Sequence, residues 1–176
     1  HTYAAAGNYT ATLTITTSNG CIVSKQKQVT VNPLPLPRFT YPPSVCLPNA
    51  SVTFTDASTI ADGTENTFTY SWRFGDGPTS TSVAKNPTHI YTADNIYNVT
   101  LTCTSGAGCK DSTTVPVDII HPQPTAAFSS DSASICETQS VQFSDNSTGA
   151  DGTVNKWLWD FGNGNSSTLQ SPPSQL

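Results

Sequence analysis

The chain has few charged residues, no methionine and no long hydrophobic run. Of its 176 residues only 11% are charged, and 7 Lys and Arg against 12 Asp and Glu give a net charge of −5. The basic residues are scattered, so nothing forms the basic stripe that neutralises phosphates, and we expect no nucleic-acid partner. No window approaches the roughly 18 to 20 apolar residues that span a bilayer, so we expect no membrane span.

Two familiar cysteine and leader patterns are also missing. No Cys-x-x-Cys spacing of the metal-binding type occurs. The chain starts at His1 without a charged and apolar leader, so we expect a mature secreted product or a piece of a larger protein. What is present, namely 5 Cys and 13 Pro among abundant Thr, Val and Tyr, favours an oxidising extracellular compartment and an all-β fold.

An internal repeat dominates the sequence. HTYAAAGNYTATLTI at residues 1–15 matches HIYTADNIYNVTLTC at residues 89–103, a shift of 88 residues (89 − 1). The same shift carries Gly20-Cys21 onto Gly108-Cys109. Repeats at such a period are typical of arrays of small structural units.

A second set of matches joins the middle of the chain to its end. SVTFTDAS at residues 51–58 matches SVQFSDNS at 140–147, and WRFGDG at 72–77 matches WDFGNG at 159–164. Pro-rich linkers, NPLPLP and HPQPT, begin at Asn32 and His121. The sequence therefore predicts three parts: residues 1–33 are the C-terminal part of one unit, residues 34–121 a complete unit, and residues 122–176 the N-terminal part of another.

Within the complete unit, apolar residues alternate with polar ones at the period of a β-strand. We expect strands around Val52 to Phe54, Phe68 to Phe74, Tyr97 to Cys103 and Val115 to Ile119, and no helical periodicity is visible. Several short strands in fewer than about 100 residues predict an antiparallel β-sandwich with one shared core.

Three segments in order carry a family resemblance. Trp72 to Gly77 (WRFGDG), Asn86 to Tyr91 (NPTHIY) and Tyr97 to Leu101 (YNVTL) resemble the PKD domain, an Ig-like β-sandwich repeat of extracellular proteins. Cys46, before the strand around Val52, and Gly108-Cys109, after the strand from Tyr97 to Cys103, resemble the cysteines of tandem PKD proteins secreted or displayed by Bacteroidetes. The resemblance implies a surface or adhesion context and no catalytic activity.

Candidate catalytic residues do not survive a comparison between the repeats. Asp76 of the FGDG turn is replaced by Asn163, and both residue types suit tight turns. His89 matches His1, but Ser174 stands at that position in the last repeat. We therefore predict no enzyme. The residues that we assign to the core and turn of each repeat are Trp72, Phe74, Gly75, Asp76, Gly77, Tyr91, Tyr97, Trp159 and Phe161.

Two binding interpretations stay open. Asp62 and Asp151 recur in the same A-D-G-T turn and are weak candidates for calcium, although no Asp-x-Asp-x-Asp run surrounds them. Otherwise we expect no metal and no cofactor. Trp72 and Trp159 have faces that suit sugar stacking, but their alternating strands favour a buried position. Trp157 stands two residues before Trp159, so we expect its side chain to point to the same inward face of the strand.

The cysteines follow the repeat. We expect Cys46 and Cys109 to form a disulfide within the complete unit, which leaves Cys21 and Cys136 with partners outside their own fragments. Cys103 matches Ile15 and is interpreted as a small buried hydrophobe without chemistry.

Partial units leave apolar faces that something must cover. Three explanations are open: the chain is a window on a longer array, its ends were trimmed or disordered, or the start of one chain completes the end of the next, in which case Cys21 could bridge Cys136 of a neighbour. We rank the longer array first.

The predicted function is an extracellular spacer or adhesive stalk of a large bacterial surface protein or filament. The partners are then neighbouring repeat units of the same or identical chains, with surface glycans or proteins as further candidates. The alternative is a carbohydrate- or protein-binding module of a secreted hydrolase or adhesin.

Overall fold

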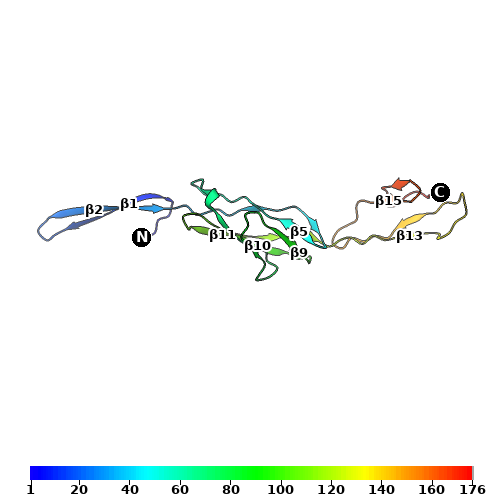
Figure 1. Cartoon of the computed structure of the whole chain (residues 1–176), viewed down its shortest axis with the longest axis horizontal. Coiled ribbons are helices and arrows are strands. Elements are labelled where there is room, and N and C mark those ends of the chain that lie inside the picture. The colour runs from blue at the N-terminus through cyan, green and yellow to red at the C-terminus, as the bar shows by residue number, and fades with distance from the viewer. Residues whose placement is uncertain (176) are drawn as a thin grey trace. The chain divides into compact units, whose positions relative to one another are not determined.

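The computed structural model describes residues 1–175, whose regular secondary structure is almost entirely β-strand (Figure 1). A single short 3-10 helix, η1 (Glu65–Thr67), interrupts them within this part of the chain. Contacts divide the chain into two compact units. The first comprises residues 1–43, 51–90 and 95–119, and the second comprises residues 44–50, 91–94 and the chain from Ile120 onward.

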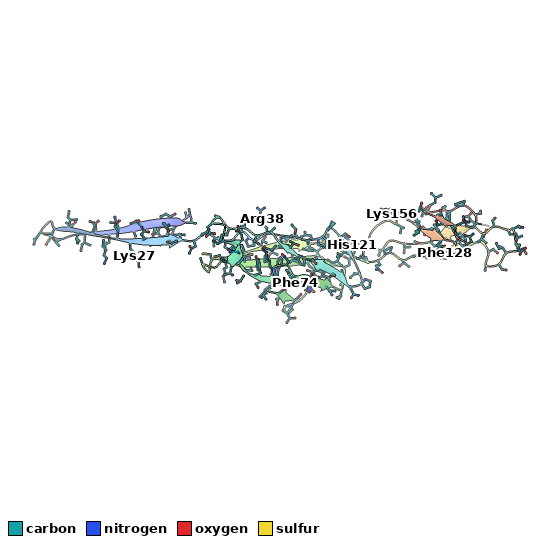
Figure 2. All side chains as sticks on the ribbon, turned by 45° about the horizontal axis from the view of Figure 1, so that its top comes forward. Lys27, Arg38, Phe74, His121, Phe128 and Lys156 are labelled. Carbon is teal, nitrogen blue, oxygen red and sulfur yellow. The ribbon has the colours of Figure 1, made fainter. Side chains whose placement is uncertain are left out.

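The first unit begins with a long hairpin of β1 (Gly7–Thr16) and β2 (Ile22–Val31). The strands pair antiparallel from Gly7 opposite Val31 to Thr16 opposite Ile22, and side chains project from both of their faces into open space (Figure 2). Leu13 and Ile15 are 67% and 54% exposed. The hairpin thus has the pairing of a sheet but no layer over its apolar residues.

The main sheet of the first unit has four strands in the order β11-β10-β7-β8. They are β7 (Thr69–Arg73), β8 (Thr81–Ser82), β10 (Tyr97–Thr104) and β11 (Lys110–Val117). Along β10 every second side chain, from Tyr97 to Cys103, is buried. The predicted alternation is confirmed, as are the strands around Phe68 to Phe74 and Tyr97 to Cys103, whereas the strand predicted from Val115 to Ile119 runs from Lys110 to Val117.

A second layer packs its aromatic side chains against this sheet. It contains β5 (Ala50–Thr53) paired with β9 (Thr88–Tyr91), and β3 (Phe39–Thr40) paired with β6 (Thr55–Asp56). The rings of Phe54 and Trp72 lie 5.8 Å apart, and both side chains are fully buried. Burial of one such side chain stabilises the fold by about 1.5–3 kcal/mol. The predicted all-β, Ig-like sandwich is confirmed.

The turn after β7 is held tightly against β10. Gly75 has φ +87°, and a Cβ atom built on it would lie 2.8 Å from the backbone oxygen of Asn98. A side chain is excluded there twice, by the left-handed backbone and by the neighbouring strand. Gly77 has open space around it, so the same restriction does not apply to the second glycine of the motif. Tyr91 and Tyr97 are both buried.

The second unit is built from three pairs of short strands. β4 (Val45–Cys46) pairs in parallel with β12 (Ile120–His121). β13 (Phe128–Ser130) pairs with β14 (Phe143–Asp145), and β15 (Trp159–Asp160) pairs with β16 (Ser166–Ser167). All of the fully buried apolar side chains of the described chain belong to residues 35–120, so this unit has no closed core beyond Ile120.

Candidate functional site

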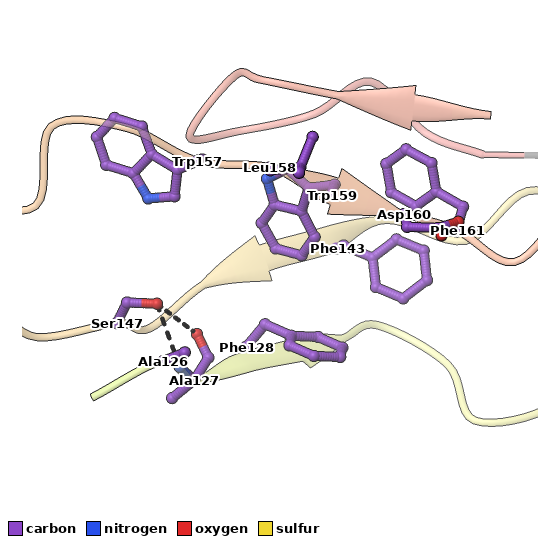
Figure 3. A pocket seen from close by; sticks show the side chains of 10 residues that line it. All are labelled: Ala126, Ala127, Phe128, Phe143, Ser147, Trp157, Leu158, Trp159, Asp160 and Phe161. Atoms are coloured by element: carbon purple, nitrogen blue, oxygen red, sulfur yellow. Dashed lines mark hydrogen bonds between the residues drawn. The ribbon is translucent and has the colours of Figure 1, made fainter. Parts of the chain in front are cut away.

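An open aromatic cleft is the most distinctive surface feature of the second unit (Figure 3). It has a volume of about 450 Å³. Strands β13, β14 and β15 supply its walls, and most of the lining is apolar. The residues that define the aromatic cleft are Ala126, Ala127, Phe128, Phe143, Ser147, Trp157, Leu158, Trp159, Asp160 and Phe161.

The rings of the cleft are arranged edge to face and in a stack. Phe128 meets Trp159 at 5.6 Å with the ring planes at 73°, and Trp159 stacks on Phe161 at 6.3 Å with the planes at 10°. Phe143 lies 6.2 Å from Trp159 and 5.6 Å from Phe161. Such contacts contribute about 0.5–1.5 kcal/mol each beyond area burial. The rings therefore hold one another in place although they remain accessible.

Hydrogen bonds from their indole nitrogens hold the two tryptophans in place. Trp157 Nε1 donates to Asp145 Oδ2 at 2.9 Å, and Trp159 Nε1 donates to the carbonyl of Leu169 at 2.8 Å. Hydrogen bonds from the hydroxyl and backbone of Ser147, together with those from Gln170 and Trp157, lower the pKa of Asp145 to about 2. The acceptor of Trp157 is thus an ionised carboxylate at any ordinary pH. Trp157 lines the cleft together with Trp159, in agreement with the prediction that the two side chains share one face of the strand.

The complete repeat contains the same constellation. Tyr70 Oη donates to Asp56 Oδ2 at 3.0 Å, which corresponds to the bond from Trp157 to Asp145. Trp72 Nε1 donates to the carbonyl of Ala84 at 2.9 Å, which corresponds to the bond from Trp159 to Leu169. Burial, followed by the hydrogen bond to Asp56 and the charge on it, raises the pKa of Tyr70 well above its usual range.

In the complete repeat the constellation is covered. Leu101 of β10 stands opposite Trp72 in the sheet, and both side chains have no exposed surface. No strand of the second unit pairs with β15 in the manner of β10; its partner within the described residues is β16. The aromatic cleft therefore has the ring arrangement around Trp72 without a strand in the place of β10.

Asp76 and His89 form the one close carboxylate and imidazole pair of the first unit. Their Oδ2 and Nε2 atoms lie 2.7 Å apart, and the imidazole stacks on Phe74 at 4.2 Å. Burial favours a higher pKa for Asp76, but hydrogen bonds from Ser80 and His89 outweigh it and lower the pKa.

The Asp76 and His89 pair has the wrong geometry for nucleophilic catalysis. Ser80 Oγ lies 3.3 Å from the same Nε2 atom that contacts Asp76. In a catalytic triad the serine and the carboxylate contact opposite nitrogens of the ring. The arrangement orders the turn, consistent with the Asn163 and Ser174 that replace the pair in the last repeat.

The two candidate calcium residues have their carboxylates engaged by protein groups. Asp62 Oδ1 accepts hydrogen bonds from the backbone nitrogen and the hydroxyl of Thr64, at 3.2 and 2.7 Å. Asp151 Oδ2 lies 2.6 Å from His121 Nδ1. No group of three or more His, Cys, Asp and Glu suited to a metal ion occurs among residues 1–175.

All five cysteines are free thiols, so the predicted Cys46–Cys109 disulfide is not formed. Cys46 lies in β4 opposite His121, whereas Cys109 Sγ lies 4.0 Å from the carbonyl oxygen of Asn32. The two cysteines thus have different neighbours, each within its own unit. Cys21 and Cys136 are exposed.

Cys103 has the environment that was predicted for it. Its side chain is fully buried, and its Sγ atom lies 3.3 Å from Ser58 Oγ. Burial raises the pKa of the thiol. It therefore acts as a small core residue.

Sequence reasoning missed the pairing of Asp56 with Tyr70 and of Asp145 with Trp157. A signal for it exists in the two repeats. Asp56 and Asp145 each follow a Phe by two residues, and Tyr70 and Trp157, which both carry a hydrogen-bond donor, each precede a Trp by two residues. The hydrogen bond between His121 and Asp151 had no such signal, because Pro33 occupies the position of His121 in the preceding linker.

Comparison with known proteins places these observations in a family. Residues 32–119, half of the chain, match the model of the PKD domain. The pre-pro-metalloprotease PrtV of Vibrio cholerae is 36% identical over 108 residues, which are 60% of this chain and 11% of that protein. The chain thus spans about a tenth of the length of the curated relatives it matches.

Two solved structures are similar to half of the chain. The PKD1 domain of Vibrio anguillarum Epp is 26% identical, covers 51% of this chain and 98% of its own, and has a TM-score of 0.42. The PKD1 domain of the Vibrio cholerae metalloprotease PrtV is 30% identical, with 51% and 99% coverage and a TM-score of 0.40. Among the described residues, no helix has the length and apolar character needed to cross a membrane.

Proposed function

Because the chain belongs to the PKD domain family, we propose that it is a non-enzymatic, extracellular tandem-repeat segment that serves as a spacer or adhesive stalk of a large bacterial surface protein or filament. The observation that carries the proposal is the recurrence of one core constellation in two successive repeats. What recurs is the packing and hydrogen bonding of Trp72 and Trp159, whereas the charged side chains beside them change.

The mechanism is mechanical. A complete repeat buries its own core between two layers, so it resists unfolding as a unit. Proline-rich linkers limit the bending between repeats. In such arrays stability is a sum of the stabilities of the units and of the contacts between neighbours, which allows length to increase without a larger core. The match to a segment of a pre-pro-metalloprotease supports an extracellular setting.

The proposed partner is a neighbouring repeat unit of the same or an identical chain. Leu13 and Ile15 of the N-terminal hairpin correspond to Leu101 and Cys103 of β10, which are buried in the complete repeat. A hairpin of this type has the side chains that the aromatic cleft requires. Its docking by strand pairing would give the cleft the cover that Trp72 has.

Stretching the full chain between two handles in an optical trap tests the mechanical role. We expect one cooperative unfolding event for the complete repeat, with an increase in contour length of about 88 × 3.6 Å less its folded length. Phe54→Ala should lower the unfolding force, and the exposed Val83→Ala is the matched control. A gradual extension without a cooperative event would refute the spacer.

The second candidate function rests on the exposure of the aromatic cleft. Phe128 and Leu158 are 65% and 82% exposed, so a sugar ring or a peptide could reach the aromatic faces. Binding of the full chain to a glycan array, abolished by Trp159→Ala and retained by Val83→Ala, would favour a binding module. Absence of binding to glycans by the wild-type chain would leave the spacer as the function.

A further inference from the structure

Four of the five cysteines recur at two fixed places in the repeat. Cys21 and Cys109 lie in the turn between the two long hairpin strands, and we call this the tip position. Cys46 and Cys136 lie before the second strand of their repeats, and we call this the entry position. Cys103 has no counterpart, because Ile15 takes its place. The repeated cysteines are also less buried than Cys103.

The tip cysteine of the complete repeat touches the linker that precedes it. Cys109 Sγ lies 4.0 Å from the backbone oxygen of Asn32, immediately before Pro33. The shift of 88 residues that defines the hairpin repeat carries Asn32 onto Ile120 and Pro33 onto His121. A tip cysteine in a following repeat would therefore meet the carbonyl of Ile120.

The entry cysteine lies at that same segment of linker, within its own repeat. Val45 stands opposite Ile120 and Cys46 opposite His121 in the parallel pair of β4 and β12. The backbone nitrogen of Leu47 donates to the carbonyl of His121 at 2.8 Å. Cys46 is therefore one strand spacing, about 4.8 Å, from the residue that follows the contact point of a tip cysteine.

The surroundings of the two linkers agree with this superposition. Pro33 and Asp62 line one hollow, and His121, Asp151 and Cys46 line another, so the A-D-G-T turn lies against the end of the preceding repeat in both places. The same junction is thus built twice. One copy shows the tip cysteine beside it, and the other copy shows the entry cysteine.

We propose that a disulfide links the entry cysteine of each repeat to the tip cysteine of the repeat that follows. The cross-link joins neighbouring repeats and not the two layers of one repeat. This inference rests on the proposed tandem array. For Cys46 the partner is the tip cysteine of the repeat that begins at the second linker, and for Cys109 it is the entry cysteine of the preceding repeat.

The chemistry of the cross-link is thiol and disulfide exchange. Two S–H bonds are broken and one S–S bond forms between the cysteines, while the two electrons and two protons pass to a disulfide oxidant, whose own S–S bond breaks to give two thiols. An oxidising extracytoplasmic compartment supplies such oxidants. The required separation of the two Cα atoms, about 5.5–6 Å, is close to the strand spacing that places Cys46 beside His121.

A tandem concatemer tests the proposal. Residues 1–173 are followed directly by a second full copy that starts at His1, because Ser174 and His1 occupy the same place in the repeat. The protein is oxidised with glutathione disulfide and its disulfide peptides are identified by mass spectrometry. We expect Cys46 linked to Cys21 of the second copy and Cys136 linked to Cys109 of the second copy, so that four of the ten thiols disappear.

Two matched variants assign the links. Cys46→Ser should abolish only the first cross-link, and Cys136→Ser only the second. Links between Cys46 and Cys109 of one copy, or between Cys136 and Cys21 of the next, would overturn the proposal, and so would ten remaining thiols in a folded protein. Protection of backbone amides from hydrogen exchange around Phe143 and Trp159 distinguishes failure of the cross-link from failure of the tandem array. Protection without the expected disulfides refutes only the cross-link. Absence of protection refutes the tandem array and the cross-link with it.

Discussion

The core of the complete repeat and the aromatic cleft contain equivalent residues in different states of burial. Phe54, Trp72 and Phe74 are at most 3% exposed, whereas Phe143, Trp159 and Phe161 are half-buried. The ring geometry hardly changes between the two places. Phe54 and Phe74 lie 5.6 Å apart with planes at 31°, and Phe143 and Phe161 have the same values.

This difference separates what the early strands determine from what the hairpin adds. The hydrogen bonds of the two tryptophan indoles, at 2.9 and 2.8 Å, form with or without a cover. The local arrangement of the rings is thus encoded by the first two thirds of a repeat. Exclusion of water, and with it most of the hydrophobic stabilisation, depends on strands that come last in the sequence.

Truncating equivalent phenylalanines should give the largest contrast. Phe54→Ala removes a fully buried ring and should lower the free energy of unfolding of the complete repeat by about 3–5 kcal/mol. Phe143→Ala should change the same transition by no more than about 0.5 kcal/mol, because it lies outside that core. Urea unfolding of the full chain followed by circular dichroism measures both. Equal losses would show that the two regions unfold as one.

Alanine at the equivalent glycines should show a smaller contrast. Gly75 and Gly162 have φ +87° and +77°, so each substitution carries a backbone cost of about 1–2 kcal/mol. Only Gly75 faces a neighbouring strand, and the overlap with Asn98 should add about 1–3 kcal/mol. Thermal unfolding of the two variants tests this, and an unchanged transition in Gly75→Ala would mean that β10 can move away from the turn.

Loss of one hydrogen-bond donor should have a still smaller effect. Tyr70→Phe removes the bond to Asp56, which is part of the buried layer, and should destabilise the complete repeat by about 1 kcal/mol. Trp157→Phe removes the equivalent bond to the half-buried Asp145, outside the core of the complete repeat, and should leave that transition unchanged. Similar urea midpoints for Tyr70→Phe and the wild-type chain would contradict a structural role for the pair.

Acid should reveal the smallest difference. The folded state lowers the pKa of Asp76 below the unfolded value of about 3.9, so its ionised form stabilises the fold above about pH 4. This contribution is lost as the pH falls through the lowered pKa. Asp76→Asn should therefore be less stable than the wild-type chain at pH 6 and equally stable at the acid end.

The matched control for Asp76 introduces a carboxylate where no imidazole is available. The counterpart of His89 in the last repeat is Ser174, so Asn163→Asp should leave the acid dependence of unfolding unchanged. Chemical unfolding between pH 2 and pH 6, fitted at each pH, gives the comparison. A pH dependence for Asp76→Asn as steep as that of the wild-type chain would exclude the pair as its source.

Most of the fold could be predicted because its signals are local. Alternating residues predict β7 and β10, and the repeat itself identifies Asp76 as a turn residue and not a catalytic one. Sequence comparison also placed Cys103 in the core. The limits of the repeats at residues 33 and 121 stay a prediction, since spatial contacts group residues 44–50 with the chain from Ile120 onward.

The Cys46–Cys109 disulfide was predicted from the repeat alone, which does not show which end of a strand each cysteine occupies. Cys46 and Cys109 belong to one repeat and both recur, so the repeat pattern favours a disulfide between them. The structure gives them different neighbours, because Cys109 contacts Asn32 whereas Cys46 pairs with His121. The aromatic cleft was foreseen as an uncovered apolar face, but its volume and ring geometry required the structure.

The parallel pairing of β4 with β12 has a consequence for a chain under tension. The chain leaves the repeat along β12 through His121 and Pro122, so a pull on that end acts along the axis of the pair. The backbone hydrogen bonds of the pair, including the one from Leu47 to His121, run across this axis, so the pull loads them together in shear. A joint loaded in shear fails only when all of its bonds fail at once, whereas a hairpin opened from its end releases them one at a time.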